Sequence, residues 1–334
     1  MSNKLLSNVL YINLSKKSYE IKKRPDLFEK YIGGTGVGIK LLEENSKQGT
    51  DAYDEQNAVI LAVGSLTPFF PLASKTAALF KSPLTGNLGE SHCGGRSAVA
   101  IRMAGYGAIV IKGKSTYPVY LDIFNNHVKF RAATMMWGMR SEATAARIIR
   151  DNTRHGKGVR SIIRIGRGGE NKVSYASVTA ETFRHFGRMG LGAVFGSKNL
   201  KGVAIAGNNS YQTENLSKYR KIYNKIYNVA TKSEVMKKYH DLGTPVNILA
   251  LNKMKGLPTK NMQKGYTQHA EQLSGEKIAE KYLGKRRACS HCPVGCIHVA
   301  ALRMQHEEEK YFFKTSMIGY DFELIYSLGT MLEI

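Results

Sequence analysis

The chain has 334 residues, with 49 Lys and Arg against 26 Asp and Glu, so its formal net charge at pH 7 is +23. Hydrophobic residues make up 43% of it, which is enough for a buried core and excludes a disordered tail or a small disulfide-stapled scaffold. No apolar run approaches the roughly 18–20 residues that cross a bilayer, and the first residues do not resemble the apolar core of a signal peptide. We therefore expect a cytoplasmic protein with no membrane partner.

The positive charge makes polyanions candidate partners, but its distribution argues against nucleic acid. The densest basic runs, such as 22–24 and 285–287, are short, and aromatic residues do not alternate with them as in a base-stacking surface. We expect no nucleic-acid partner. An acidic partner chain, or an acidic remainder of a longer protein, is the alternative that the charge leaves open.

The first 208 residues predict short strands separated by glycine-rich turns. The expected strands are 8–14, 19–22, 58–63, 76–80, 108–112, 119–124, 128–131, 161–165 and 203–206. The expected helices are 26–32, 38–46, 96–103 and 141–152, the last with Ser141 as its N-cap. Because the strands come in groups rather than alternating with helices, residues 1–208 predict an α+β domain.

After residue 208 the pattern changes to that of helices. Apolar residues recur every three or four positions in 215–238, 246–253 and 275–283. We expect residues 209–334 to form the start of a mainly helical domain that is truncated. Residues 321–334 are typical of the opening of an apolar helix, which predicts that a further part of the protein, or a second chain, covers it.

Three of the four cysteines, Cys289, Cys292 and Cys296, lie within eight positions of one another, which in a reducing compartment indicates a metal site. The C-x2-C-x3-C spacing favours three ligands of an iron–sulfur cube. A fourth ligand is not local, since the remaining Cys93 lies far upstream. Zinc with His291 or His298 as the fourth ligand, and reduced thiols with a structural role, are the alternatives.

Three glycine-rich loops stand out, at residues 33–38, 86–96 and 184–192. Glycine lets backbone N–H groups approach phosphate oxygens, so each loop is a candidate anion site. The first lacks the strand–turn–helix context of a dinucleotide fingerprint, and an ordinary helix-entry turn explains it better. The other two also contain Arg96, Arg184 and Arg188, which favour an anionic cofactor. Their histidines, His92 and His185, taken alone are more readily explained as ordinary loop residues.

In order and spacing these motifs resemble the tungsten-containing aldehyde ferredoxin oxidoreductases. The resemblance rests on KSPLTGN at 81–87, GG at 94–95, MAGYGAIVIKG at 103–113, GRMGLGAVFGSKNLK at 187–201 and the cysteine loop. It extends from Lys75 to Gly329. It implies a base of two β-sheets that carries a bis-pterin metal cofactor, tungstopterin or molybdopterin, followed by helical domains.

The resemblance also implies which residues bind that cofactor. Lys75 stands where the family often has an arginine between pterin and cluster, and a lysine keeps the charge but loses the bidentate fork. The first pterin-phosphate loop contains His92 and Gly94, and the second contains Arg184, His185, Gly187 and Arg188. The backbone carbonyls at His92 and His185 are similar to those that hold Mg²⁺ between the two cofactor phosphates.

The metal and catalytic residues implied by the resemblance lie in the second half of the chain. Cys289, Cys292 and Cys296 look like three of four ligands of a 4Fe–4S cluster. Glu323 falls where the family has a carboxylate beside the metal, which suits it to moving a proton. An ordinary glutamate near a helix N-terminus is the alternative for Glu323.

The resemblance implies oxidation of an aldehyde to a carboxylic acid, with electrons passing through the cluster to ferredoxin, a carrier that a basic surface would favour. Family members are much longer, and the missing half resembles the part that supplies the fourth cluster cysteine, a second pterin wall and a histidine near the metal. We therefore expect the chain to need a C-terminal half or a second subunit, and a homo-oligomer is left open. The alternatives are a non-catalytic, metal-stabilised basic binding protein and an inactive remnant.

Overall fold

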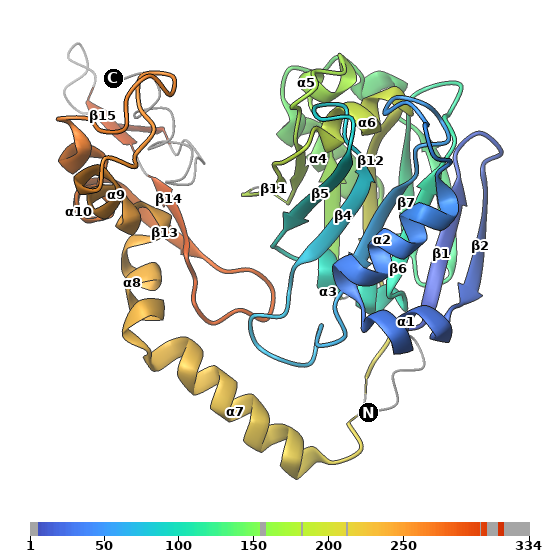
Figure 1. Ribbon diagram of the computed structural model, residues 1–334, viewed down its shortest axis with the longest axis horizontal. Coiled ribbons are helices and arrows are strands. Elements are labelled where there is room, and N and C mark those ends of the chain that lie inside the picture. The colour runs from blue at the N-terminus through green and yellow to red at the C-terminus, as the bar shows by residue number, and fades with distance from the viewer. Residues whose placement is uncertain are drawn as a thin grey trace. The chain divides into compact units, whose positions relative to one another are not determined.

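The computed structural model describes residues 6–153, 158–181, 183–211 and 213–300, together with two short strands at 302–305 and 313–316 (Figure 1). The chain divides into two compact units, Met1–Arg220 and Lys221–Ile334. Among the helices within the described ranges, none is both long enough and apolar enough to cross a membrane.

The first unit is built on two six-stranded sheets. The strands of the first sheet are β1 (Asn8–Asn13), β2 (Ser18–Lys23), β3 (Val59–Val63), β4 (Thr76–Lys81), β5 (Leu88–Cys93) and β6 (Ala108–Lys112). Those of the second are β7 (Val119–Phe124), β8 (His127–Ala132), β9 (Arg160–Arg164), β10 (Val178–Ala180), β11 (Arg184–Phe186) and β12 (Leu200–Ala206). Their orders are β2-β1-β6-β3-β4-β5 and β11-β10-β9-β12-β7-β8. Both sheets are mixed, because β1 pairs with β6, and β7 with β12, in parallel.

The helices of this unit pack on the outer faces of the sheets and between them. They are α1 (Pro25–Tyr31), α2 (Gly34–Asn45), α3 (Ser97–Ala104), the short 3-10 helix η1 (Thr134–Met136), α4 (Glu142–Asn152), α5 (Arg167–Glu170) and α6 (Leu191–Ser197). Helix α2 packs on the first sheet and α4 on the second, whereas α3 contributes to the core between the sheets (Figure 1).

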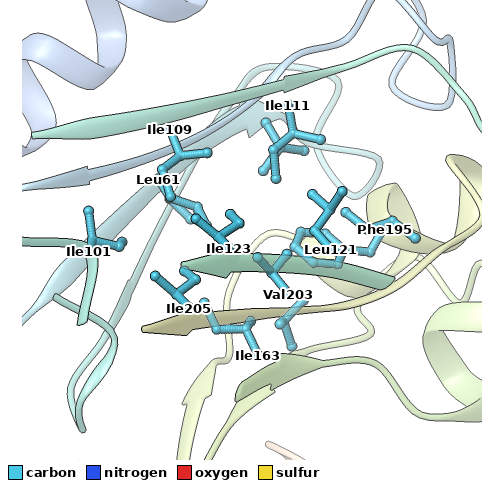
Figure 2. Packing of buried hydrophobic residues seen from close by; sticks show 14 of the residues in the cluster. Leu61, Ile101, Ile109, Ile111, Leu121, Ile123, Ile163, Phe195, Val203 and Ile205 are labelled. Atoms are coloured by element: carbon cyan, nitrogen blue, oxygen red, sulfur yellow. The ribbon is translucent and has the colours of Figure 1, made fainter. Parts of the chain in front are cut away.

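The largest core lies between the two sheets, where Leu61 and Ile109 of the first sheet meet Leu121 and Val203 of the second (Figure 2). The alternate residues of the first-sheet strands, such as Ile60, point to the opposite face and pack against α2. Because both faces of these strands are buried, their sequences are continuous apolar runs, as in VILAV over β3.

The chain after residue 215 begins with helices. These are α7 (Leu216–Lys232), α8 (Glu234–Leu242), η2 (Thr244–Asn247), α9 (Ile248–Lys253), η3 (Ala270–Leu273) and α10 (Gly275–Tyr282). Two antiparallel pairs of short strands follow, β13 (Leu283–Arg287) with β14 (Ile297–Ala300) and β15 (Leu302–Gln305) with β16 (Phe313–Ser316). The expected class, an α+β base with two sheets followed by helices, is therefore confirmed.

Several element boundaries differ from the sequence-based expectation. The single helix expected over 215–238 is two helices, because Ser233 leaves the helical conformation and its Oγ accepts a hydrogen bond from Met236 N at 3.4 Å, which caps α8. The glycine-rich loops contain the unexpected strands β5 and β11 and the start of α6. Helix α6 needs its glycines, since a Cβ on Gly196 would collide with the Gly169 carbonyl of α5. The helix expected at 321–334 lies outside the described residues.

Candidate functional site

The two loops expected to bind cofactor phosphates meet where edge strand β5 of the first sheet contacts edge strand β11 of the second (Figure 1). Arg188 N, just after β11, donates to Ser91 Oγ on β5 at 3.1 Å. Ser82 Oγ, in the turn between β4 and β5, donates to the Met189 carbonyl at 2.8 Å. Segments about one hundred residues apart in the chain therefore form one continuous surface.

Lys75, just before β4, and Gly94 of the first loop lie at the same end of the β4–β5 hairpin. Thr76 is directly opposite Cys93 in the strand register, and Lys75 and Gly94 flank that pair. The side chain of Lys75 is exposed, whereas Cys93 is buried in the core between the sheets. This end of the hairpin thus presents the Lys75 cation, whereas Gly94 is buried and Cys93 packs as a small apolar residue.

The imidazole of His92 contacts a carboxylate of its own strand. His92 Nε2 lies 2.6 Å from Glu90 Oε1, and Thr35 Oγ1 of α2 donates to the same oxygen at 2.9 Å. These two contacts, with His92 the stronger, hold the pKa of Glu90 below its usual range. The first glycine-rich segment, which contains Thr35, therefore contacts the 86–96 loop through Glu90, a residue that was not anticipated from the sequence.

The second loop is anchored by Phe186, whose ring is buried in the core between the sheets. Strand β11 pairs with β10 so that His185 lies opposite Thr179 and Arg184 opposite Ala180. His185, Gly187 and Arg188 are exposed, and Arg184 is half-buried. The segment therefore places a glycine backbone and one exposed arginine beside the first loop.

Glu181, directly after β10, links the first loop to β9 of the second sheet, and sequence reasoning did not single it out. Its carboxylate accepts hydrogen bonds from Arg96 N at 3.2 Å and from the Ser161 hydroxyl. A Cβ on Gly95, whose φ is +90°, would collide with this carboxylate, so a glycine is needed there for packing. Burial raises the pKa of Glu181, and the hydrogen bonds from Ser161 and Arg96 oppose that shift.

Gly187 has open space where a side chain would stand, unlike the glycines at 190 and 192, and this space fits an anionic cofactor. A Cβ on Gly187 would meet nothing within 4 Å, so packing within the protein does not require a glycine there. Gly190, by contrast, has φ +77° and a Cβ on it would collide with the Ser174 carbonyl. An open glycine backbone next to the exposed Arg188, in a loop that contacts the loop bearing the exposed Arg96, is what close approach of phosphates requires.

The three clustered cysteines lie in the loop that joins β13 to β14. Cys292 N donates to the Cys289 carbonyl at 3.1 Å, which closes a turn between these two residues. Backbone φ angles of +58° at His291 and +63° at Gly295 curve the loop further. All three thiols are reduced and half-buried. Thiolates carried on one short, curved loop are a donor set that fits an iron–sulfur cluster.

The described part of the cysteine loop does not form a complete set of metal ligands in this structure. Among the residues whose positions are described, no three side chains of His, Cys, Asp or Glu converge to hold a metal ion. His298 is buried, and its Nε2 and Nδ1 atoms face the carbonyls of His240 at 2.8 Å and Cys296 at 3.1 Å. Both of its ring nitrogens are thus directed at main-chain oxygens. Glu323, the expected proton-transfer carboxylate, lies outside the described residues.

Two family models match almost the entire chain. The aldehyde ferredoxin oxidoreductase N-terminal domain matches residues 9–207, and domains 2 and 3 of the same family match residues 221–334. A two-sheet base with apposed loops, followed by helices and a cysteine loop, thus corresponds to a known class of protein. The chain belongs to the aldehyde ferredoxin oxidoreductase family.

Relatives within the family are similar over nearly the full chain. The chain is 33% identical over 329 residues to the tungsten-containing aldehyde ferredoxin oxidoreductase of Pyrococcus furiosus, covering 97% of this chain and 52% of that protein. It is 32% identical over 333 residues to the protein of the same description from Pyrococcus abyssi, covering 98% and 52%. The chain thus spans about half the length of the curated relatives it matches.

A solved structure shares the fold and part of the sequence. The active-site complex of benzoyl coenzyme A reductase with 1,5-dienoyl-CoA is similar with a TM-score of 0.74 and 25% sequence identity. The match covers 90% of this chain and 47% of that chain.

Proposed function

We propose that this chain provides the pterin-binding base and the cluster-carrying region of an oxidoreductase that converts aldehydes to carboxylic acids. The observation that carries the proposal is the junction of the two loops at β5 and β11, where the open backbone of Gly187 lies next to the exposed Arg188 and Arg188 N is hydrogen-bonded to Ser91 of the first loop. The family membership supports the same function. The site would carry a bis-pterin cofactor of tungsten, or of molybdenum, together with Mg²⁺ between its phosphates.

The residues of the two loops would hold the cofactor by its charge. Lys75 and Arg188, both exposed, would neutralise phosphate oxygens, and Arg184 would add a cation at the base of the second loop. The backbone at Gly94 and Gly187 would let the phosphates approach closely. The main-chain carbonyls of His92 and His185 are the proposed Mg²⁺ ligands, since hard cations prefer oxygen.

The three cysteines would hold the cluster through which electrons leave. Cys289, Cys292 and Cys296 would supply three thiolates, and the fourth ligand would come from the C-terminal half or a second subunit. When bound, the pterin cofactor would supply two-electron oxidation of the aldehyde hydrate, and the cluster held by the three cysteines would supply one-electron transfer to ferredoxin. Oxidation of the hydrate to the acid also releases two protons, and Glu323 is the proposed acceptor for one of them.

The remaining proposals concern partners and location. The formal charge of +23 favours docking of an acidic electron carrier such as ferredoxin. We propose a cytoplasmic protein that acts with a C-terminal half or second subunit, with no nucleic acid or membrane as partner.

Aldehyde-dependent reduction of a viologen dye tests the proposed function, with the chain purified without oxygen together with its C-terminal half or second subunit. We expect reduction with at least one member of a panel of aliphatic and aromatic aldehydes, and its loss in Arg188→Gln because the cofactor phosphates lose a cation. Arg147→Gln is the matched control, since Arg147 is also exposed but lies on α4. Protein that carries the pterin metal and reduces no dye with any aldehyde would contradict the proposal.

A further inference from the structure

A histidine of helix α8 makes a hydrogen bond to the backbone of the cysteine loop. His240 Nδ1 lies 2.6 Å from the carbonyl oxygen of Val294. Because a carbonyl oxygen only accepts, Nδ1 carries a proton and donates it to this bond. Val294 stands between Cys292 and Cys296, so the bond fixes a peptide inside the segment that carries the thiols.

His240 is itself fixed through its main chain. Its carbonyl accepts a hydrogen bond from Arg286 Nε at 3.1 Å and faces His298 Nε2 at 2.8 Å. Arg286 and His298 are directly opposite each other on β13 and β14, the strands that flank the cysteine loop. His240 lies in the last turn of α8, where carbonyls lack helical partners, so these contacts also satisfy the helix end.

These contacts determine how the loop backbone is turned. In a trans peptide the carbonyl and the following N–H point in opposite directions, so holding the Val294 carbonyl toward His240 turns the Gly295 N–H away from it. Gly295 adopts φ +63°, which glycine tolerates best, and a Cβ there would lie 3.5 Å from His240 Nδ1. Backbone N–H groups around a cluster tune its charge and potential, so the orientation of this peptide matters to the metal site.

We propose that His240 is a positioning residue for the iron–sulfur site: it ligates no iron, but its Nδ1–H holds the Val294–Gly295 peptide and with it the relative placement of the loop thiols. The role rests on the proposed cluster at Cys289, Cys292 and Cys296. His240 stands outside every motif that carries the sequence resemblance, and its contacts with the loop are what assign the role.

The test compares three variants of the full 334-residue chain, purified without oxygen. His240→Leu removes the donor, whereas His240→Asn places an amide N–H near the position of Nδ1. His269→Leu is the control, because His269 is an exposed histidine whose side chain contacts only the neighbouring Gln268 among the described hydrogen bonds. The readouts are iron per chain, the rate of iron release to a chelator, and the electron paramagnetic resonance spectrum of the reduced protein.

We expect iron release to be about 10-fold faster in His240→Leu, with a changed spectrum, as is typical when a residue that orients metal ligands is lost. His240→Asn should restore most of the slow release, and His269→Leu should match the wild type. Equal release rates in wild type and His240→Leu would overturn the positioning role while leaving the cluster in place. A wild-type chain that holds no iron would overturn the cluster proposal and this inference with it.

Discussion

The junction between the two cofactor loops depends on two buried serine hydroxyls, and removing either one should loosen it. Ser82 Oγ donates to the Met189 carbonyl at 2.8 Å and accepts from two main-chain N–H groups of its own turn at 3.1 and 3.2 Å. Ser91 Oγ accepts from Arg188 N at 3.1 Å. Both serines have 0% of their surface exposed, so water does not compete at the hydroxyls in the folded state.

The number of hydrogen bonds sets the expected loss of stability. A hydrogen bond contributes about 0.5–1.5 kcal/mol net to the free energy of unfolding. Ser82→Ala removes three of them and should cost about 3 kcal/mol. Ser91→Ala removes one and should cost about 1 kcal/mol, because the exposed backbone at Arg188 regains water. The two substitutions should nevertheless both lower the tungsten or molybdenum content, since each releases the second loop from the first.

Denaturant unfolding with a shared slope gives the two free energies, and metal analysis gives the cofactor content. Ser197→Ala is the matched control, because Ser197 Oγ makes one buried hydrogen bond of 3.0 Å to Val194 O within α6. It should cost about as much stability as Ser91→Ala and leave the cofactor content unchanged. If Ser197→Ala lowers the cofactor content as much as Ser91→Ala, the junction is not what positions the site.

Three further predictions concern buried charges and glycine. Burial lowers the pKa of Lys198 from 10.5 to about 8, so the unfolded chain binds more protons between these pH values. The unfolding free energy of the wild type should therefore rise across that window by about 3 kcal/mol relative to Lys198→Met, and a pH-independent difference would refute this. Burial raises the pKa of Glu181, so ionisation of its carboxyl group lowers the stability of the folded state. Glu181→Gln should therefore melt at a higher temperature than the wild type at pH 7 and at the same temperature below pH 4.5. A lower melting temperature of Glu181→Gln at pH 7 would contradict this reasoning. Gly187→Ala should change the free energy of unfolding by less than about 0.5 kcal/mol yet lower the cofactor content. Gly190→Ala should lower the free energy of unfolding by more than about 3 kcal/mol. Equal effects of the two substitutions on unfolding would show that the backbone at Gly187 is not open.

Much of the base domain could be predicted from the sequence because its central strands are buried on both faces. Short runs rich in β-branched residues, such as VILAV in β3 and AIVIK in β6, strongly favour a strand. Strand β5 was missed because it lies at a sheet edge and its buried positions are Gly89, Ser91 and Cys93, which are small and carry little strand preference. The break between α7 and α8 was missed because one serine in a long amphipathic pattern gives a weak signal.

The candidate site residues could be proposed from the sequence where the signal is local, but not where it depends on long-range contacts. Glycine beside arginine marked both loops that the structure brings together, and spacing marked the cysteine loop. The serine contacts that join the loops connect residues far apart in the chain, so no sequence window contains them. Glu181 and His240 were missed for the same reason, since each acts through residues of another element.

Metal analysis and visible absorption of the wild-type chain, purified without oxygen, test the central claim most directly. The account predicts about one tungsten or molybdenum and about three to four iron atoms per chain, with the broad visible absorption of an iron–sulfur cluster. About one zinc per chain with neither tungsten nor molybdenum would contradict it, and would indicate a metal-stabilised binding protein that keeps the family's loops without their cofactor.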